Sequence, residues 1–256
     1  MQPRSDGVGA GEAGAGKAGK RKAAGVAAEP GRDGTPIDRP KARARGPYLR
    51  MPGAGLRARG LGRAATALDV VAVRTLLAEA VETAGVESAW NDVARPVLAA
   101  VAERWAYTGA GIEVEHLLSE CVIGVFAGHA AQASHRSDVR PVLVAALPGE
   151  LHTLPMIVLS ATLADRGVPC RPLGPNLPGE ALVSAVRRTA PSAVVLWSQL
   201  PATADVEVVA SLPRTRPPFR TFVAGPGWAG VKLPPRVVHL VSLGAAGAAI
   251  GAAVLV

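Results

Sequence analysis

The sequence predicts an α/β protein in which a small helical bundle precedes a doubly wound parallel sheet. Two observations support this fold class. Apolar residues recur at helical spacing between about residues 56 and 131, and short apolar strands alternate with helical segments from residue 140 onward. Residues before 56 show neither pattern. We therefore expect three regions: a disordered basic tail (1–55), a helical bundle cap (56–135) and a sheet domain (138–256).

Basic residues are concentrated in the tail. Residues 1–63 contain 14 Lys and Arg against 5 Asp and Glu, a net charge of +9, whereas the remainder of the 256-residue chain has a net charge of −1. Residues 1–55 are rich in Gly, Ala, Pro, Arg and Lys, a composition typical of disorder. Clustered cations bind phosphates, so the tail predicts at most non-specific contact with DNA. A solubilising tail or an over-extended gene start is the alternative interpretation.

The rest of the composition favours a cytoplasmic protein that is not an enzyme. Cys121 and Cys170 have no second thiol nearby in the sequence, which indicates a reducing compartment. The N-terminus is Gly- and Lys-rich, so we expect no signal peptide. The longest apolar run, Leu243 to Val256, has 14 residues and is too short to span a membrane. No acid/base pair, nucleophile triad or phosphate-binding loop is recognisable, so independent catalysis is not expected.

The first folded region is expected to contain three or four short helices that form a small bundle. Asp69 is a candidate N-cap, and Pro96 either kinks the second long helix or begins a fresh one at its first turn. Gly109 and Gly111 are expected to end the preceding helix before the last one begins. The stretches assigned to helices are 61–69, 70–85, the segment after Gly85 that continues past Pro96, and Ile112 to about Ala131, with a linker over 132–138.

From Arg140 onward, buried strands alternate with helices. Each strand–helix–strand unit is a right-handed crossover, which predicts a doubly wound, Rossmann-like parallel sheet. In such sheets a ligand lies beyond the carboxyl ends of the strands, so the loops there should carry the site. The expected strands are 141–147, 169–173, 193–197, 220–224 and 237–241, and the expected helices are 154–166, 180–189, 206–212 and 245–254.

Polar residues and glycines occupy three of these loops. After the first strand, Glu150 precedes His152 by two residues, and a carboxylate so placed can polarise one ring nitrogen while the other ligates a metal. The loop after the third strand reads Ser198-Gln-Leu200. The loop after the fourth reads Gly225-Pro-Gly227, where glycine permits close approach of the backbone to a bulky ligand. Taken singly, a lone histidine is more often structural and Gly-Pro-Gly is an ordinary turn.

Taken in order, the three loop motifs resemble the signature of cobalamin-binding domains, in which Asp-x-His-x-x-Gly is followed by Ser-x-Leu and then by Gly-Gly. The resemblance implies that His152 replaces the cofactor's own base as the lower ligand of cobalt. It also implies a channel for the displaced nucleotide tail, lined by the serine and glycine loops. This chain departs from the signature in having Glu150 for Asp, Pro155 for Gly and an interrupted glycine pair. The matching positions are Glu150, His152, Ser198, Leu200, Gly225 and Gly227.

A second pattern lies in the helical region, where Trp105 is followed by nine residues and then by Glu115-His116. Supporting phrases are Gly62-Arg-Ala-Ala and Trp90-x5-Pro96-x-Leu98. This pattern resembles the cap of the MerR-type, cobalamin-dependent photoreceptor repressors. The resemblance implies that Trp105 covers the upper face of the corrinoid while Glu115 and His116 contact the adenosyl group, which favours adenosylcobalamin over methylcobalamin. A core tryptophan and a solvated helix face are the alternative interpretation.

Two features distinguish this chain from those repressors. The repressors carry an N-terminal winged helix-turn-helix that residues 1–55 cannot form, and they have a histidine after the tryptophan where this chain has Ala106. Three hypotheses remain open. The first, favoured by the Trp105 pattern, is an adenosylcobalamin-binding sensor that acts by forming a homo-oligomer or through a partner transcriptional regulator. The second is a corrinoid carrier subunit of a methyltransferase. The third is a degenerate paralogue that no longer binds cobalamin, an interpretation supported by Pro155 and Ala106.

Overall fold

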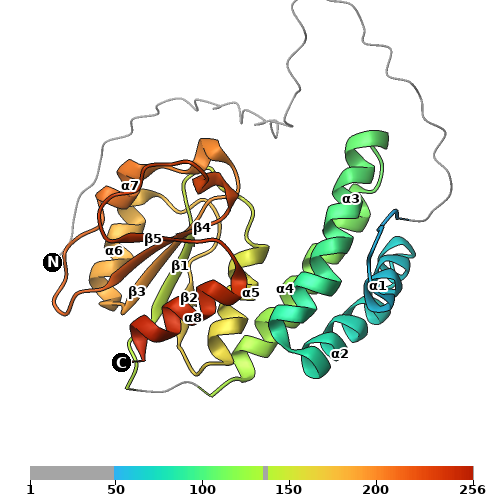
Figure 1. Ribbon diagram of the computed structural model, residues 1–256, viewed down its shortest axis with the longest axis horizontal. Helices are drawn as coiled ribbons and strands as arrows, with labels where there is room; N and C mark the ends of the chain where they lie inside the picture. Colours follow the sequence, from blue (N-terminus) through green and yellow to red (C-terminus); the bar gives the residue numbers. More distant parts are fainter. Residues whose placement is uncertain (1–48, 135–137, 256) are drawn as a thin grey trace, which may run out of the picture. The chain divides into compact units, whose positions relative to one another are not determined.

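The computed structural model describes residues 49–134 and 138–255 (Figure 1). Within these residues a helical region precedes a parallel sheet with helices on both faces, so the predicted α/β class and the order of its two parts are confirmed. The prediction of a disordered tail falls largely on residues 1–48, and part of the predicted linker falls on 135–137. Both lie outside the described residues. No helix in the described part of the chain is long and apolar enough to cross a membrane.

The helices of this region begin and end close to the expected residues. The Asp69 carboxylate accepts a hydrogen bond from the N–H of Ala72 at 2.9 Å and so caps the second helix as predicted. Gly85 interrupts that helix with φ +79°. Pro96 begins a fresh helix at its first turn, where no N–H is needed, and Gly109 ends it in the left-handed conformation. The elements are α1 (Leu56–Thr66), α2 (Val70–Ser88), the π-type segment η1 (Ala89–Ala94), α3 (Arg95–Thr108) and α4 (Ile112–Gln132).

The core of the helical region extends further toward the N-terminus than the sequence suggests. Its centre includes Trp90 and Phe126, whose rings meet edge-to-face with centroids 6.4 Å apart. Leu49 and Met51 pack against this core, and a Cβ on Gly62 would press into the Met51 side chain. The helical region therefore packs from Leu49 onward, whereas the sequence analysis placed residues 49–55 in the tail. Two apolar residues in an irregular segment carry no periodicity, so the pattern could not reveal this contact.

The described residues form a five-stranded, wholly parallel sheet in the order β2-β1-β3-β4-β5. All five residues of β1 are buried, as expected of a strand near the centre of a sheet covered on both faces. The strand order reverses beside β1, and the carboxyl ends of β1 and β3 lie next to each other at this switch point. The strands are β1 (Val142–Ala146), β2 (Cys170–Pro172), β3 (Ala193–Trp197), β4 (Arg220–Ala224) and β5 (Val237–Leu240).

Helices cover both faces of the sheet, as the doubly wound prediction requires (Figure 1). One face packs against α5 (Leu154–Ala164) and α8 (Leu243–Val254), and the other against α6 (Gly179–Thr189) and α7 (Val206–Ala210). The last helix begins earlier than predicted because the Ser242 hydroxyl accepts from the N–H of Ala245 and caps it. Two short 3₁₀ turns, η2 (Pro201–Thr203) and η3 (Pro226–Trp228), lie in the loops after β3 and β4.

The helical region is joined to the sheet domain through α4 and α5, which pack along each other. Val158 and Ala161 of α5 belong to the same apolar core as Phe126 of α4. Near the C-terminal ends of both helices, His129 Nε2 lies 2.6 Å from Asp165 Oδ1. The two helices therefore run side by side in the same direction. The start of α4 and the loop that precedes α5 accordingly lie at the same end of this pair.

Candidate functional site

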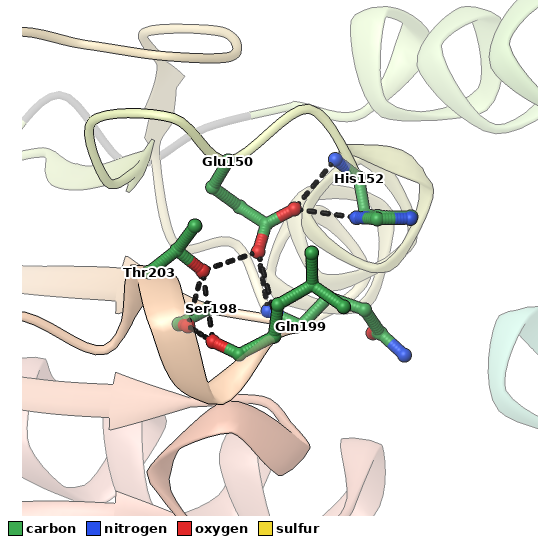
Figure 2. A network of polar contacts seen from close by, with 6 residues as sticks. Glu150, His152, Ser198, Gln199 and Thr203 are labelled. Atoms are coloured by element: carbon green, nitrogen blue, oxygen red, sulfur yellow. Dashed lines mark hydrogen bonds and ion pairs between the residues drawn. The ribbon is translucent and has the colours of Figure 1, made fainter. Parts of the chain in front are cut away.

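The loop between β1 and α5 holds its polar residues in a defined arrangement (Figure 2). Gly149 has φ +79°, a conformation that favours glycine, and it turns the chain at the carboxyl end of the sheet. The loop is fastened by Asn176 after β2. The side-chain oxygen of Asn176 accepts from the N–H of Gly149 at 2.7 Å, and its backbone N–H donates to the carbonyl of Glu150 at 2.8 Å. The Glu150 side chain consequently turns inward and is 0% exposed.

His152 is held by Glu150, as predicted from their spacing. Glu150 Oε1 lies 2.6 Å from His152 Nδ1 and accepts from the backbone N–H of His152 at 2.8 Å (Figure 2). The His152 side chain is 54% exposed. With Nδ1 facing the carboxylate, Nε2 lies on the outer side of the ring. Such a pairing sets the tautomer and increases the basicity of the outer nitrogen, which is the arrangement of metal-ligating histidines.

The second oxygen of Glu150 ties the histidine loop to the loop after β3. Oε2 accepts from the N–H of Gln199 at 2.7 Å, from the N–H of Leu200 at 3.3 Å and from the hydroxyl of Thr203 at 2.8 Å. Burial by itself raises the pKa of Glu150, but the hydrogen bonds from His152, Thr203 and Gln199 outweigh it and lower the pKa to about 2. Glu150 is therefore a buried carboxylate that stays ionised and orients His152.

Two members of this network were missed by the sequence analysis. Thr203 is buried and links the Glu150 carboxylate to Ser198, whose hydroxyl oxygen lies 2.7 Å from that of Thr203. Asn176 fastens the loop from the β2 side. For Asn176, a signal existed in its position in a Pro-Asn-Leu-Pro turn after a strand. For Thr203, the surrounding Pro-Ala-Thr-Ala gave no pattern that distinguishes a buried hydroxyl from an exposed one.

The serine and glycine loops lie directly against each other. Ser198 is fully buried and its hydroxyl donates to the carbonyl of Leu200 at 2.8 Å. Gly225 has φ +105°, and a Cβ there would clash with the carbonyl oxygen of Ser198. A Cβ on Gly227 would clash with the Ser198 hydroxyl and the carbonyl of Leu200. The sequence analysis expected these glycines to approach a ligand, whereas here they permit close contact with the chain's own loop.

The predicted cap residues lie near the turn between α3 and α4. Trp105 is in the last turn of α3 and is 50% exposed, which argues against the alternative of a core tryptophan. Glu115 and His116 lie near the start of α4, where the Glu115 carboxylate accepts from the Ser119 hydroxyl at 2.8 Å. His116 precedes His129 by thirteen residues and His152 precedes Asp165 by the same number. Because α4 and α5 run in parallel, His116 and His152 lie at the same end of the helix pair.

The structure therefore brings the predicted residues together as two groups. One group, at the carboxyl ends of β1, β3 and β4, is joined by direct contacts and consists of Glu150, His152, Ser198, Leu200, Gly225 and Gly227. The other group consists of Trp105, Glu115 and His116 on the α3–α4 hairpin. Among the described residues no hydrogen bond or ion pair joins the two groups.

One family model matches within the helical part of the chain. Residues 57–127 match the family described as B12 binding domain. This segment runs from α1 into α4 and includes all three predicted cap residues. The structure is also similar to the monomethylamine corrinoid protein of Methanosarcina barkeri. That similarity has a TM-score of 0.52 at 12% identity and covers 75% of this chain and 95% of that protein. At this identity the similarity shows a shared fold, in which a helical region precedes a Rossmann-like parallel-sheet domain.

Two further solved structures match at lower TM-scores. A cobalamin-binding protein from Desulfitobacterium hafniense DCB-2 is 16% identical, with 75% of this chain and 96% of that chain covered and a TM-score of 0.35. The methanol:cobalamin methyltransferase complex MtaBC from Methanosarcina barkeri is 13% identical, with coverages of 77% and 80% and a TM-score of 0.35. None of these three is described as a MerR-type regulator. Comparison with the curated proteins finds no significant match.

The residues at the carboxyl ends of the strands fit the ring of a corrinoid. A corrinoid carries its own cobalt in a macrocycle, so the protein needs to supply one axial ligand rather than a cluster. The described residues contain no group of three or more His, Cys, Asp or Glu that could hold a free metal ion. The outward imidazole of His152 can supply the single ligand. Leu151 precedes it in the sequence and is 69% exposed, and Leu200 in the loop after β3 is also exposed. These apolar side chains suit an apolar macrocycle.

Proposed function

We propose that this chain is a corrinoid-binding module in which His152 is the lower axial ligand of cobalt. The observation that carries the proposal is the Glu150–His152 pair: a buried, ionised carboxylate holds Nδ1 and leaves Nε2 exposed at the carboxyl end of β1. The match of residues 57–127 to the B12 binding domain supports the same ligand independently, because that segment does not include His152. The corrinoid supplies the cobalt, and the chain supplies the axial nitrogen and its orientation.

We further propose that the module is a sensor that binds adenosylcobalamin and acts through self-association or a partner regulator. Trp105 is half-exposed at the end of the α4–α5 pair where His152 also lies, so its indole is available to cover the upper face of the ring. Glu115 and His116 begin the neighbouring helix and are placed to contact an upper ligand. A bulky adenosyl group would be recognised by these side chains, whereas a methyl group would reach fewer of them.

A corrinoid carrier subunit of a methyltransferase is the second candidate. Its support is the fold shared with the monomethylamine corrinoid protein, which extends over nearly the full length of that protein. A carrier must expose its upper face to a partner enzyme, so tight enclosure of an adenosyl group is not expected of it. Higher affinity for adenosylcobalamin than for methylcobalamin supports the sensor. The reverse order supports the carrier.

The lower-ligand proposal is tested by titrating the full chain with adenosylcobalamin in the dark. We expect a His152→Ala variant to bind at least about tenfold more weakly, equivalent to about 1.4 kcal/mol, and to leave any bound cofactor with its own base attached. His129→Ala is the matched control, because His129 also contacts a carboxylate, that of Asp165, but lies at the opposite end of α5. The control should bind as the wild type does.

Three outcomes would contradict parts of this proposal. Equal affinity and an equal visible spectrum for wild type and His152→Ala would remove His152 from the ligand role. Equal losses in both variants would mean that the effect is structural. An absence of binding by the wild type to any cobalamin would favour the degenerate paralogue, for which Pro155 in the first turn of α5 and Ala106 after Trp105 are the supporting departures.

A further inference from the structure

The loops after β3 and β4 lie directly against each other in this chain. The resemblance that the loop motifs carry implies a channel between the serine loop and the glycine loop. In this chain the two loops are hydrogen-bonded to each other. The N–H of Gly227 donates to the carbonyl of Ser198 at 3.1 Å, directly beyond the last bond of the β3–β4 ladder, in which the N–H of Ser198 donates to the carbonyl of Ala224 at 3.0 Å. No side chain the size of a methyl group fits at Gly225 or Gly227.

The hydroxyl and carboxylate groups at these loops are hydrogen-bonded to one another, whereas the buried indole N–H groups of Trp197 and Trp228 have no hydrogen-bond partner. The Ser198 hydroxyl donates to the Leu200 carbonyl, and its oxygen lies 2.7 Å from the Thr203 hydroxyl, which donates to Glu150 (Figure 2). Ser198 and Glu150 are both completely buried. Opening the loops to admit a tail would break this network and so disturb the carboxylate that orients His152.

A bulky side chain lies on the sheet face next to the loops. Trp197, the residue before Ser198, packs on the face covered by α5 and α8, and a Cβ on Gly225 would come within 3.3 Å of its ring. The two covering helices lie close together, since a Cβ on Gly247 of α8 would clash with Thr162 of α5 and with Arg166, which follows α5. Pro155 stands in the first turn of α5, where the family signature has glycine. Two surface hollows formed by described residues lie beside α6 and beside α3.

We infer that this chain recognises the corrinoid ring through His152 and leaves the nucleotide tail outside the sheet domain. The inference rests on the proposed function, because it concerns how the same site takes its ligand. It has a consequence for ligand choice. In intact cobalamin the tail base must leave cobalt before His152 can bind, and this step costs free energy. With the tail outside the protein, burial of the tail does not offset that cost. A corrinoid that lacks the tail has no base to displace. Tail-free corrinoids are therefore the preferred ligand class.

The test compares aquacobalamin with diaquacobinamide, the corresponding corrinoid without the nucleotide tail, by calorimetric titration of the full chain. We expect cobinamide to bind at least as tightly as cobalamin, and His152→Ala to weaken cobinamide binding about tenfold or more. Tighter binding of cobalamin than of cobinamide would overturn the inference and leave the proposed function standing. Failure of both corrinoids to bind would instead overturn the proposed function.

Phosphorus NMR of the bound cobalamin gives a second readout that needs no variant. The tail contains a phosphodiester, and a tail outside the protein moves freely. We expect its resonance to remain narrow in the complex. A resonance broadened to the tumbling of the whole protein would show that the tail is held within the chain, which would overturn the inference even if the two affinities were equal. Free cobalamin in the same buffer serves as the unbound reference.

Discussion

The loop after β1 and the α3–α4 hairpin carry the two halves of the candidate site, and the two differ in burial and in hydrogen bonding. In the loop, Glu150 is fully buried and both of its oxygens accept hydrogen bonds, one from His152 and the other from the loop after β3. On the hairpin, Trp105 is half-exposed, His116 is exposed, and the side-chain hydrogen bond of Glu115 is to its own helix.

The difference indicates that the lower side of the site is preorganised and the upper side is not. A ligand that meets His152 finds its orientation already set, so little ordering opposes binding from that side. The exposed side chains of the α3–α4 hairpin would become ordered only on contact with a ligand. In the proposed site, binding of an upper ligand would therefore order the hairpin more than the loop. This asymmetry suits a sensor, and the following variants test it from each side.

Glu150→Gln is expected to have the largest effect. The amide would place a donor against donors that now converge on a carboxylate, so we expect a loss of about 2–4 kcal/mol in the free energy of unfolding together with weaker corrinoid binding. Glu180→Gln, an exposed glutamate in the first turn of α6, is the control and should change stability by less than about 0.5 kcal/mol. Urea unfolding of the wild type and the two variants measures the changes in stability. A Glu150→Gln protein as stable as the control would show that the network does not preorganise the loop.

The same carboxylate makes stability depend on pH in a defined window. The pKa of Glu150 is lowered from 4.5 to about 2 in the folded protein, so its contribution is complete above the unfolded value of 4.5 and is lost as the pH falls toward 2. The contribution is at most about 3 kcal/mol. The difference in free energy of unfolding between wild type and Glu150→Gln should shrink as the pH falls through this window. A difference that stays constant with pH would assign the effect to packing rather than to charge.

Trp105→Ala tests the other half of the comparison. Because the indole is half-exposed, we expect a change in stability of less than about 1 kcal/mol. We expect the affinity for adenosylcobalamin to fall several-fold more than that for hydroxocobalamin, because only the former has a large upper ligand. Tyr107→Ala is the matched control, an exposed aromatic residue on the same helix. Calorimetry with both corrinoids decides the point, and equal losses for the two would mean that Trp105 serves only the helical core.

The smallest effect on corrinoid binding is expected from removal of the basic tail. Deleting residues 1–48 removes ten of the fourteen Lys and Arg in residues 1–63 but keeps Leu49 and Met51, which pack on the helical core. Any DNA binding by the full chain should be non-specific, weaken steeply with salt and disappear on deletion. Corrinoid affinity should stay within about twofold. Mobility shifts with operator-like and random duplexes test this, and sequence-selective binding that survives the deletion would point to a DNA-reading surface in the described part.

Much of the fold was predictable because its signals are local. The bounds of β3 and β4 were predicted to the residue, since each is an apolar run ended by turn residues. The cap at Asp69 and the helix end at Gly109 depend on single residues with specific backbone roles. The Glu150–His152 pair belongs to the same class, because two residues of spacing within one loop already place the carboxylate beside the ring.

The contacts that complete the site depend on which strands are neighbours, and no local pattern encodes that. Thr203 reaches Glu150 only because β3 lies beside β1 in the sheet. The closed contact between Ser198 and Gly227 likewise follows from β4 lying beside β3. By itself the sequence determined the elements, the caps and the histidine with its carboxylate. The tertiary structure decided what that carboxylate holds on its other side and how closely the loops meet, because those hydrogen bonds join residues about fifty positions apart.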